Sequence, residues 1–593
     1  MGILLRRSWV LGTAMSLALL PTIIAWPAGA VSAAPQPLQL NEGWASSWSF
    51  NPFAADFQNF STVTSLPLAY QLRPSGQYFP MLATSWTVTP KAITLHLRTN
   101  ARWQDGTKIT SRDVMDTFEL RGSFGELIGA SNGIIGMSAS GPYTVTFTLV
   151  PGTYPGTILQ TILSQTLAPA KEYGRFVKPG LLQKDLVANS GKTGKAVSAA
   201  QAFTKNVSDA LIKYQPKTYI GDGPYQISAM TTNEVILKKS PTFYDKGPIH
   251  VPEIVIWQAA SNSQGWAEMA AGRTDYAWTG APLNIVKRWE SNPANKTVKV
   301  WDWSTYDWYF NDRRYPLSNV KVRQAIAYVL NRPKLTEIGN GFMRNYPTQT
   351  IDGLQHVYAH RWLTPQEMRS LNPYSLNPAK AASLLTSLHF KRTPHGWVMP
   401  NGKPFTLSIS APSGYSGPTI SAEEAAAELS HFGIKTSASA IEQPGYWTQL
   451  NKGQYDIAWG WGGWWVLNPI QEFYDNLVNE NFTPHQPGYI GLGFGPKVNV
   501  PGVGRVNITQ NLTTDLQDLH THAQIAKVVW DYARLVNQQL PFMEYNSKRD
   551  LIFYSTQRYT DWPGPKSTWW NQLGGNANGA LALMILHGYI RPR

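Results

Sequence analysis

The sequence predicts a mixed α/β protein with several domains. Its 593 residues are several times the usual length of one domain, which is about 100 to 200 residues. Hydrophobic residues make up 43% and charged residues 15%, a composition typical of a folded globular chain. Short segments with strand alternation are interleaved with segments of helical periodicity, and this favours a mixed α/β class over an all-helical or all-β class.

The N-terminus resembles a secretory signal. An arginine pair at positions 6 and 7 precedes an apolar stretch over 9–25, and small residues follow at 30–34. This order predicts a signal peptide over residues 1–33 with cleavage after Ala33. The arginine pair leaves the twin-arginine route open beside the general route. No later stretch approaches 18 consecutive apolar residues, so we expect the mature chain not to span a membrane.

Cysteine is absent, which excludes disulfides, thiolate metal sites, cysteine nucleophiles and a lipid anchor on cysteine. The net charge is +14, but no run of five or more Lys or Arg residues marks a nucleic-acid arm. We therefore expect no nucleic-acid partner, no metal and no cofactor.

Several local elements are predictable in order along the chain. Strand alternation marks 94–98 and 143–149, and Asp105-Gly106 is a tight-turn dipeptide. Thr110 and Asp113 form a capping box that should begin a helix. A second helix is predicted over 322–330, stopped by Pro333. The Ala-, Ser-, Lys- and Gln-rich segment 186–213 is expected to be an insertion or lid rather than a core element.

Short motifs follow one another along the chain in a fixed order: PMLATSW at 80–86, LR at 97–98, WQDGT at 103–107, DV at 113–114, GDGPY at 221–225, AGRTD at 271–275, FN at 310–311, VRQAI at 322–326, NR at 331–332 and GQYD at 453–456. Together they resemble the extracytoplasmic solute-binding proteins of ABC importers, family 5. That family includes oligopeptide, dipeptide, nickel and cello-oligosaccharide binders. Asp222 departs from the pattern, because threonine is usual there.

The resemblance implies a two-lobe periplasmic-binding-protein clamp of type II, from the large cluster with an extra inserted subdomain. The implied boundaries are 34–74 for the first segment of lobe I, 75–213 for the inserted subdomain, 214–300 for the second segment of lobe I, 301–547 for lobe II, and 548–593 for the return to lobe I. Ligand would lie between the lobes, and closure would present a closed face to the permease. We expect a monomer outside the cytoplasmic membrane.

Aromatic clusters supply the candidate ligand-binding residues. The chain has 24 tryptophans, and one group alternates with glycines directly after the Y-D motif. Flat rings and close backbone approach suit a binding cleft, whereas two rings on one side of a strand can simply fill a core. A second group lies near the N-terminus, where the family lines its cleft. The candidates are Trp44, Trp48, Phe53, Trp459, Trp461, Trp464 and Trp465.

The ligand class stays open between peptide and sugar. Peptide-binding members carry an aspartate in a D-Y-x-x-P-like motif that pairs with the peptide's amino group. Alignment on Pro469 places Trp465 at that aspartate, so the charge anchor is missing unless Asp456 or Glu472 replaces it. A buried ammonium without a carboxylate is strongly disfavoured, whereas a neutral sugar stacks well on tryptophan. An oligopeptide is the default, with an oligosaccharide close behind.

Enzyme motifs are not found in the sequence. Neither a G-x-S-x-G elbow nor a phosphate-binding loop is complete, so we expect no catalytic residues and no turnover. A secreted carbohydrate-active enzyme remains an alternative, because two catalytic carboxylates leave no sequence signature. A secreted adhesion or chaperone-like protein is the third class.

Overall fold

The computed structural model describes residues 36–43, 48–54, 56–60, 62–73, 75–151, 155–340, 350–463, 469–479, 492–518, 521–573 and 577–593. Residues 36–593 form one compact unit. The predicted signal peptide, 1–33, lies outside the described residues.

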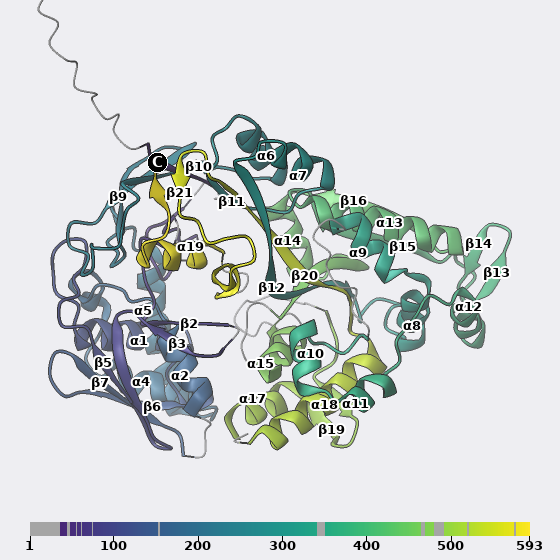
Figure 1. The fold of residues 1–593 in the computed structure, drawn as a ribbon. Coiled ribbons are helices and arrows are strands. Elements are labelled where there is room, and N and C mark those ends of the chain that lie inside the picture. Colours follow the sequence, from purple (N-terminus) through teal and green to yellow (C-terminus); the bar gives the residue numbers. More distant parts are fainter. Residues whose placement is uncertain are drawn as a thin grey trace, which may run out of the picture. The chain divides into compact units, whose positions relative to one another are not determined.

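Ten of the described strands form one mixed sheet that runs through this unit (Figure 1). Its parallel and antiparallel pairs occur in blocks, with a run of three antiparallel pairs at the centre and two parallel pairs on either side of that run. In spatial order the strands are β16 (Lys435–Ile441), β15 (Thr406–Pro412), β17 (Ile457–Gly462), β12 (Asn295–Phe310), β20 (Phe542–Ser555), β11 (Tyr276–Trp278), β1 (Leu38–Glu42), β10 (Glu253–Gln258), β9 (Glu234–Lys239) and β8 (Tyr225–Met230).

The two central strands, β12 and β20, connect two separate hydrophobic cores. Val298 and Val300 at the start of β12 belong to one core, while the end of the strand, from Tyr306, belongs to the other. In β20 the change falls between Tyr545 and Ile552. We call the part built on β1 and β8–β11 the first lobe and the part built on β15–β17 the second lobe. The core changes beside the predicted boundaries at 300/301 and 547/548, which remain predictions.

A smaller antiparallel sheet lies within residues 75–213 and has a core of its own, to which Leu68 and Ala69 also contribute. Its strands and the nearby helices are β4 (Ala83–Val88), β5 (Ala92–Leu97), β7 (Thr144–Leu149), β6 (Ile134–Ala139), α1 (Ser111–Gly122), α2 (Pro155–Leu163), α3 (Ala170–Tyr173), α4 (Leu181–Ala188) and α5 (Lys195–Lys213). The sheet arises from the alternation predicted for 94–98 and 143–149. Segment 186–213 is mostly helical, and α5 buries Val207 and Leu211 in a cluster with Phe53, so it does contribute to a core.

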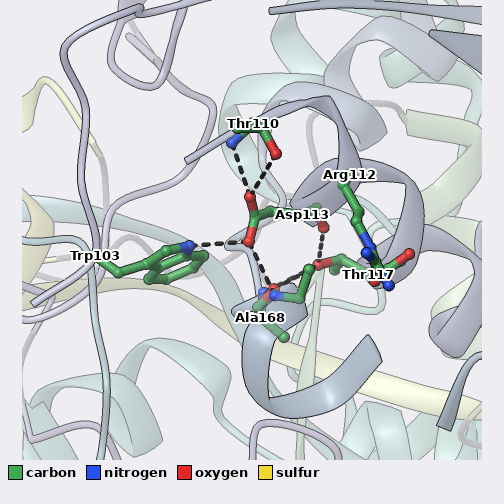
Figure 2. Close-up of polar contacts among 8 residues, drawn as sticks. Trp103, Thr110, Arg112, Asp113, Thr117 and Ala168 are labelled. Atoms are coloured by element: carbon green, nitrogen blue, oxygen red, sulfur yellow. Dashed lines mark hydrogen bonds and ion pairs between the residues drawn. The ribbon is translucent and has the colours of Figure 1, made fainter. Parts of the chain in front are cut away.

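The DV motif residue Asp113 holds this subdomain together (Figure 2). Its carboxylate accepts hydrogen bonds from the indole N–H of Trp103 (2.9 Å), the backbone N–H of Ala170 (2.9 Å) and the backbone N–H of Thr110 (2.7 Å). The last contact is the aspartate arm of the predicted capping box, which α1 confirms. The hydroxyl of Thr117 donates to the Asp113 carbonyl. Trp103, Thr110 and Asp113 therefore serve the fold.

The backbone of the GDGPY motif packs closely against the backbone of Val63 and Thr64. A Cβ on Gly221 would lie 1.9 Å from the carbonyl oxygen of Thr64, and one on Gly223 would lie 2.2 Å from that of Val63. No side chain fits at these distances, which explains both glycines.

The rest of the first lobe comprises β2 (Ala69–Gln71), β3 (Tyr78–Pro80), α6 (Asn262–Ala270), α7 (Leu283–Glu290), β21 (Tyr559–Thr560), α19 (Ala577–Leu586) and β22 (Arg591–Pro592). The second lobe adds α8 (Val320–Val329), α9 (Arg332–Asn340), α10 (His356–Trp362), α11 (Pro365–Ser370), α12 (Pro378–Ser387), β13 (Lys391–Thr393), β14 (Gly396–Val398), α13 (Ser416–Phe432), α14 (Gln443–Asn451), α15 (Pro469–Tyr474), β18 (Lys497–Val500), β19 (Gly504–Asn507), α17 (Ile508–Asp518) and α18 (His522–Gln539). Helix α8 matches the prediction, but Pro333 lies in the first turn of α9 instead of stopping α8. Proline is well tolerated there, because the first N–H groups of a helix need no intrahelical acceptor.

Candidate functional site

The two long strands are irregular where they pass between the lobes. Their antiparallel register shifts between Trp301 and Thr305 of β12. Within this shift Trp303 has a φ of 61°, a left-handed conformation that a bulky side chain rarely adopts. We call Trp301–Thr305 together with Ser547–Arg549 of β20 the crossing point. Residues held in this way cost about 1 to 3 kcal/mol and tend to occur at functional sites.

Three charged side chains form a buried group at the crossing point. The ammonium of Lys548 contacts the carboxylate of Asp302 and lies 3.1 Å from that of Asp550. Only 13% of the Lys548 side chain is exposed, against 2% and 5% for the two aspartates. The hydroxyl of Ser304 donates to Asp302 (2.8 Å), and the indole of Trp278 donates to Asp550 (2.7 Å). The group thus spans β11, β12 and β20.

The surroundings shift the proton affinities of this group. Burial alone would lower the pKa of Lys548, but Asp302 and Asp550 together raise it well above its usual value. Burial and the charge of Asp302 raise the pKa of Asp550 to about 6, against the lowering effect of Lys548. The ammonium therefore stays charged at neutral pH, and the group has more negative than positive charge.

Aromatic and cationic side chains gather around Trp301. The ring of His356, at the start of α10, stacks on the indole with centroids 5.9 Å apart and planes 11° apart. The guanidinium carbon of Arg549 lies 4.1 Å from the Trp301 centroid. Burial, His360 and Arg549 together lower the pKa of His356, so its imidazole is neutral at neutral pH. Trp301 is half-buried and keeps a partly exposed surface.

A first-lobe arginine reaches the same place. Arg73 follows β2, and its guanidinium carbon lies 5.7 Å from the ring centroid of Trp303. The ring of Tyr358 in α10 is 6.0 Å from Trp303, edge to face. Burial lowers the pKa of Arg73 to about 10, while Tyr358 and Asp302 raise it. Arg73 therefore stays protonated between a first-lobe loop and a second-lobe helix.

The predicted tryptophan cluster is only partly visible. Trp459 and Trp461 both lie on β17, with ring centroids 4.6 Å apart. Trp459 is completely buried, whereas Trp461 is half-buried and stacks on Trp447 of α14 at 5.6 Å. Tyr415 approaches both rings at 5.7 Å. Trp459 therefore fills the core of the second lobe in this structure.

Trp464 and Trp465 lie outside the described residues. The chain leads toward them from β17, whose last residue, Gly462, pairs with Thr305 at the crossing point. A Cβ on Gly463 would lie 2.5 Å from a carboxylate oxygen of Glu472. The same oxygen accepts the backbone N–H of Gln355, the residue that precedes α10.

The N-terminal aromatic candidates have structural neighbours. Trp44 lies outside the described residues. Trp48 is half-buried and packs edge to face on Phe60 at 6.2 Å. Phe53 is buried and stacks on Phe124, also at 6.2 Å. Phe53 is thus joined to the α5 cluster, and its place in the ligand site stays a prediction.

Both alternative charge anchors are engaged inside the second lobe. Asp456 forms an ion pair with Arg314 (2.8 Å) and accepts the N–H and the hydroxyl of Ser408. Glu472 is completely buried, and burial raises its pKa well above the usual value. Neither carboxylate is presented to a ligand in this structure.

The lobes also contact each other through α6 and α13. The amide of Asn262 donates to the hydroxyl of Ser416 (3.1 Å), and Thr279 donates to Asn262 (3.1 Å). Over the part of the chain that the structure describes, no group of three or more acidic or histidine side chains is arranged to hold a metal ion. None of the described helices combines the length and the apolar character that a membrane-crossing helix needs.

Residues 77–483 match the family model of bacterial extracellular solute-binding proteins, family 5, middle region. The chain belongs to this family. It is 22% identical to the periplasmic oligopeptide-binding protein OppA of Haemophilus influenzae, over 54% of this chain and 58% of that protein. It is 23% identical to the heme-binding protein A of the same species, over 44% of this chain and 46% of that protein. The matched stretches thus span about half the length of these relatives.

Solved structures confirm the predicted two-lobe α/β fold. A Thermotoga maritima oligopeptide-binding protein of an ABC transporter, crystallised with mannohexaose, has a TM-score of 0.72 and 20% identity, covering 94% of this chain and 98% of that chain. NikZ of Campylobacter jejuni, in complex with Ni(L-His), has a TM-score of 0.66 and 18% identity, covering 93% and 99%. The Bacillus subtilis protein AppA, in complex with a nonapeptide, has a TM-score of 0.67 and 14% identity, covering 91% and 99%.

The charged and aromatic residues at and beside the crossing point were not predicted from the sequence. Arg73, Trp303, Lys548 and Asp550 belong to no motif. Pairing of β20 with β12 brings Lys548 and Asp550 to Asp302, and Arg73 reaches Trp303 from the loop after β2. The single sequence signal is the unusual concentration of Trp, Asp and Lys in 301–303 and 548–550.

Proposed function

We propose that the protein captures an oligopeptide between its two lobes and delivers it to the permease of an ABC importer. Membership of family 5 supports this, as do relatives named for oligopeptide binding. The observation that carries the proposal is the crossing point, where two continuous strands join separate cores beside half-buried aromatic and cationic side chains. Two strands of this kind are suited to hinge bending.

An oligosaccharide is the second candidate ligand. The Thermotoga maritima neighbour was crystallised with mannohexaose, and it shares the fold along nearly the whole chain. The half-buried rings of Trp447 and Trp461 offer flat faces suited to sugar rings. With Asp456 and Glu472 both engaged, a neutral ligand also needs no carboxylate anchor.

Calorimetric titration with a peptide library and with a cello-oligosaccharide series tests the two ligands. For a stacked sugar, Trp464→Ala or Trp465→Ala should weaken binding by about 1 to 3 kcal/mol, as for other rings stacked on aromatic side chains. Asp456→Asn and Glu472→Gln should leave a sugar unaffected. Binding of neither series would refute the proposed function.

We also propose that the protein works outside the cytoplasmic membrane as a monomer without turnover. Periplasmic relatives and the extracellular family support the location. Closure around a ligand should reduce the radius of gyration in small-angle scattering and raise Tm by mass action. Saturable hydrolysis of a peptide or glycan by the purified protein would contradict the absence of turnover.

A further inference from the structure

One half-buried cation beside the crossing point, Arg73, has donor capacity that the described residues leave unused. The Nη1 nitrogen of Arg73 is buried and has no hydrogen-bond partner within the described ranges. No carboxylate in those ranges forms an ion pair with Arg73. The carboxylate of Asp302, whose charge acts on Arg73, is already bound to Lys548 and Ser304.

A guanidinium in this state is costly unless an acceptor completes it. Arginine carries five N–H donors. A buried donor without an acceptor lowers the stability of the fold by the full desolvation penalty of that group. Such unsatisfied groups in native structures call for an explanation. A bound ligand that supplies a hydrogen-bond acceptor is one. The ring of Trp303 supplies a cation–π contact but no hydrogen-bond acceptor.

The position of Arg73 favours a ligand as the source of that acceptor. Its backbone N–H is bound to the carbonyl of Gln572 in the first lobe (2.7 Å), so its loop is held on that side. Its side chain lies against Trp303 and near Tyr358, which is 2% exposed and belongs to the core of the second lobe. A solute enclosed between the lobes therefore meets Arg73 from the first lobe.

We propose that Arg73 anchors the bound solute through a carboxylate, so that the ligand is a linear molecule held by its acidic end. This inference rests on the proposed function and deepens it. Guanidinium and carboxylate are matched in geometry and can form two parallel hydrogen bonds. The two carboxylates considered as anchors for an amino end, Asp456 and Glu472, are both engaged elsewhere in the second lobe. In a peptide the anchored group is the C-terminal carboxylate.

Modified ligands test the anchor without altering the protein. A random pentapeptide library is offered in three forms: free, amidated at the C-terminus and acetylated at the N-terminus. Binding is read by native mass spectrometry and calorimetry. Amidation should weaken binding by about 10- to 100-fold, as loss of a charge-assisted hydrogen bond predicts, and acetylation should weaken it less than about threefold. A penalty for acetylation alone, or for neither change, would overturn the anchor while the binding function stands.

Variants then assign the effect to one residue. Arg73→Gln should bind the free and the amidated peptides equally, and Arg73→Lys should retain part of the difference. Arg98→Gln is the matched control, since Arg98 also covers an aromatic ring, that of Tyr244 at 4.3 Å, but belongs to the smaller sheet's subdomain. If Arg73→Gln keeps the full penalty for amidation, another cation holds the carboxylate and the proposal is wrong.

An acidic sugar tests the carboxylate anchor independently of whether the ligand is a peptide. Oligogalacturonate carries carboxylates, whereas cellopentaose does not. Binding of oligogalacturonate that depends on Arg73, without binding of any peptide, would remove the oligopeptide from the proposed function and leave the anchor in place. Binding of cellopentaose unaffected by Arg73→Gln would overturn the anchor, and binding of no probe would overturn both proposals.

Discussion

Replacing Lys548 with methionine tests the charged group at the crossing point. Lys548→Met keeps most of the side-chain volume but leaves the carboxylates of Asp302 and Asp550 facing each other without a cation. Because all three side chains are almost fully buried, the change isolates negative charge in a low-dielectric environment. Breaking a buried pair in this way costs about 3 to 5 kcal/mol.

The size of the thermal effect follows from the length of the folded unit. Roughly 560 residues, Gln36–Arg593, at about 2.1 cal/mol/K each give an unfolding entropy near 1.2 kcal/mol/K. A loss of about 3 to 5 kcal/mol therefore lowers Tm by only about 3 to 4 °C if the unit melts as one. Urea unfolding followed by tryptophan fluorescence gives the more sensitive reading.

The pH dependence supplies an internal check. In the wild type, burial and Asp302 already raise the pKa of Asp550 to about 6. A carboxylate whose pKa is higher in the folded than in the unfolded state makes stability fall as pH rises from about 4 through that value. Loss of Lys548 should raise this pKa further, so the variant should be weakest at pH 8 and recover toward pH 5. The triple variant with Asp302→Asn and Asp550→Asn should restore most of the loss, and equal urea midpoints for wild type and Lys548→Met at pH 8 would refute the reasoning.

Three further changes have defined outcomes. Gly223→Ala should destabilise the protein by about 2 kcal/mol or more in urea titrations, because its Cβ would lie 2.2 Å from the carbonyl oxygen of Val63. Gly247→Ala serves as the control, since its Cβ would lie 3.8 Å from the nearest atom, a carboxylate oxygen of Asp245. Burial raises the pKa of Asp222 to about 7, so the free energy of unfolding should fall as pH rises from about 4 to 7. Asp222→Asn should remove up to about 4 kcal/mol of this pH dependence. A stability–pH curve that the substitution leaves unchanged would argue against a buried acid. Trp459→Ala should cost about 3 to 5 kcal/mol of unfolding free energy, since the ring is completely buried, and a milder loss in calorimetry would mean that the ring is not core.

Local elements were predictable because their causes are local. The capping box of α1 needs only Thr110 and Asp113, three residues apart, and Gly106, with a φ of 85°, is required by its own turn. The prediction that Pro333 stops α8 was wrong. Because proline lacks a backbone N–H, it is unfavourable inside a helix but well tolerated in the first turn, so the same residue type can mark a helix end or a helix start. Only the structure shows that α9 begins within three residues of the end of α8.

The site was less predictable because its members come from distant segments. Trp459 and Trp461 alternate along β17, but their different burial depends on Tyr415, which directly precedes α13, and on Trp447 of α14. The Asp222 substitution illustrates the same limit. Its carboxylate accepts the backbone N–H of Leu66, a contact that spacing along the sequence cannot indicate.

The position of β20 in the sheet fixes the order in which the chain can fold. This strand lies between β12 and β11, yet it is made from residues 542–555, near the end of the chain. Until it is synthesised, β12 has a free edge on the side that β20 will occupy, and no hydrogen-bonded strand joins β1 and β8–β11 to the strands of the second lobe. A nascent chain that stops before residue 542 therefore leaves both cores open at the same edge, where strands of another chain can pair. Both lobes therefore need β20 to complete their part of the sheet, although most of the residues of each lobe precede β20 in the chain.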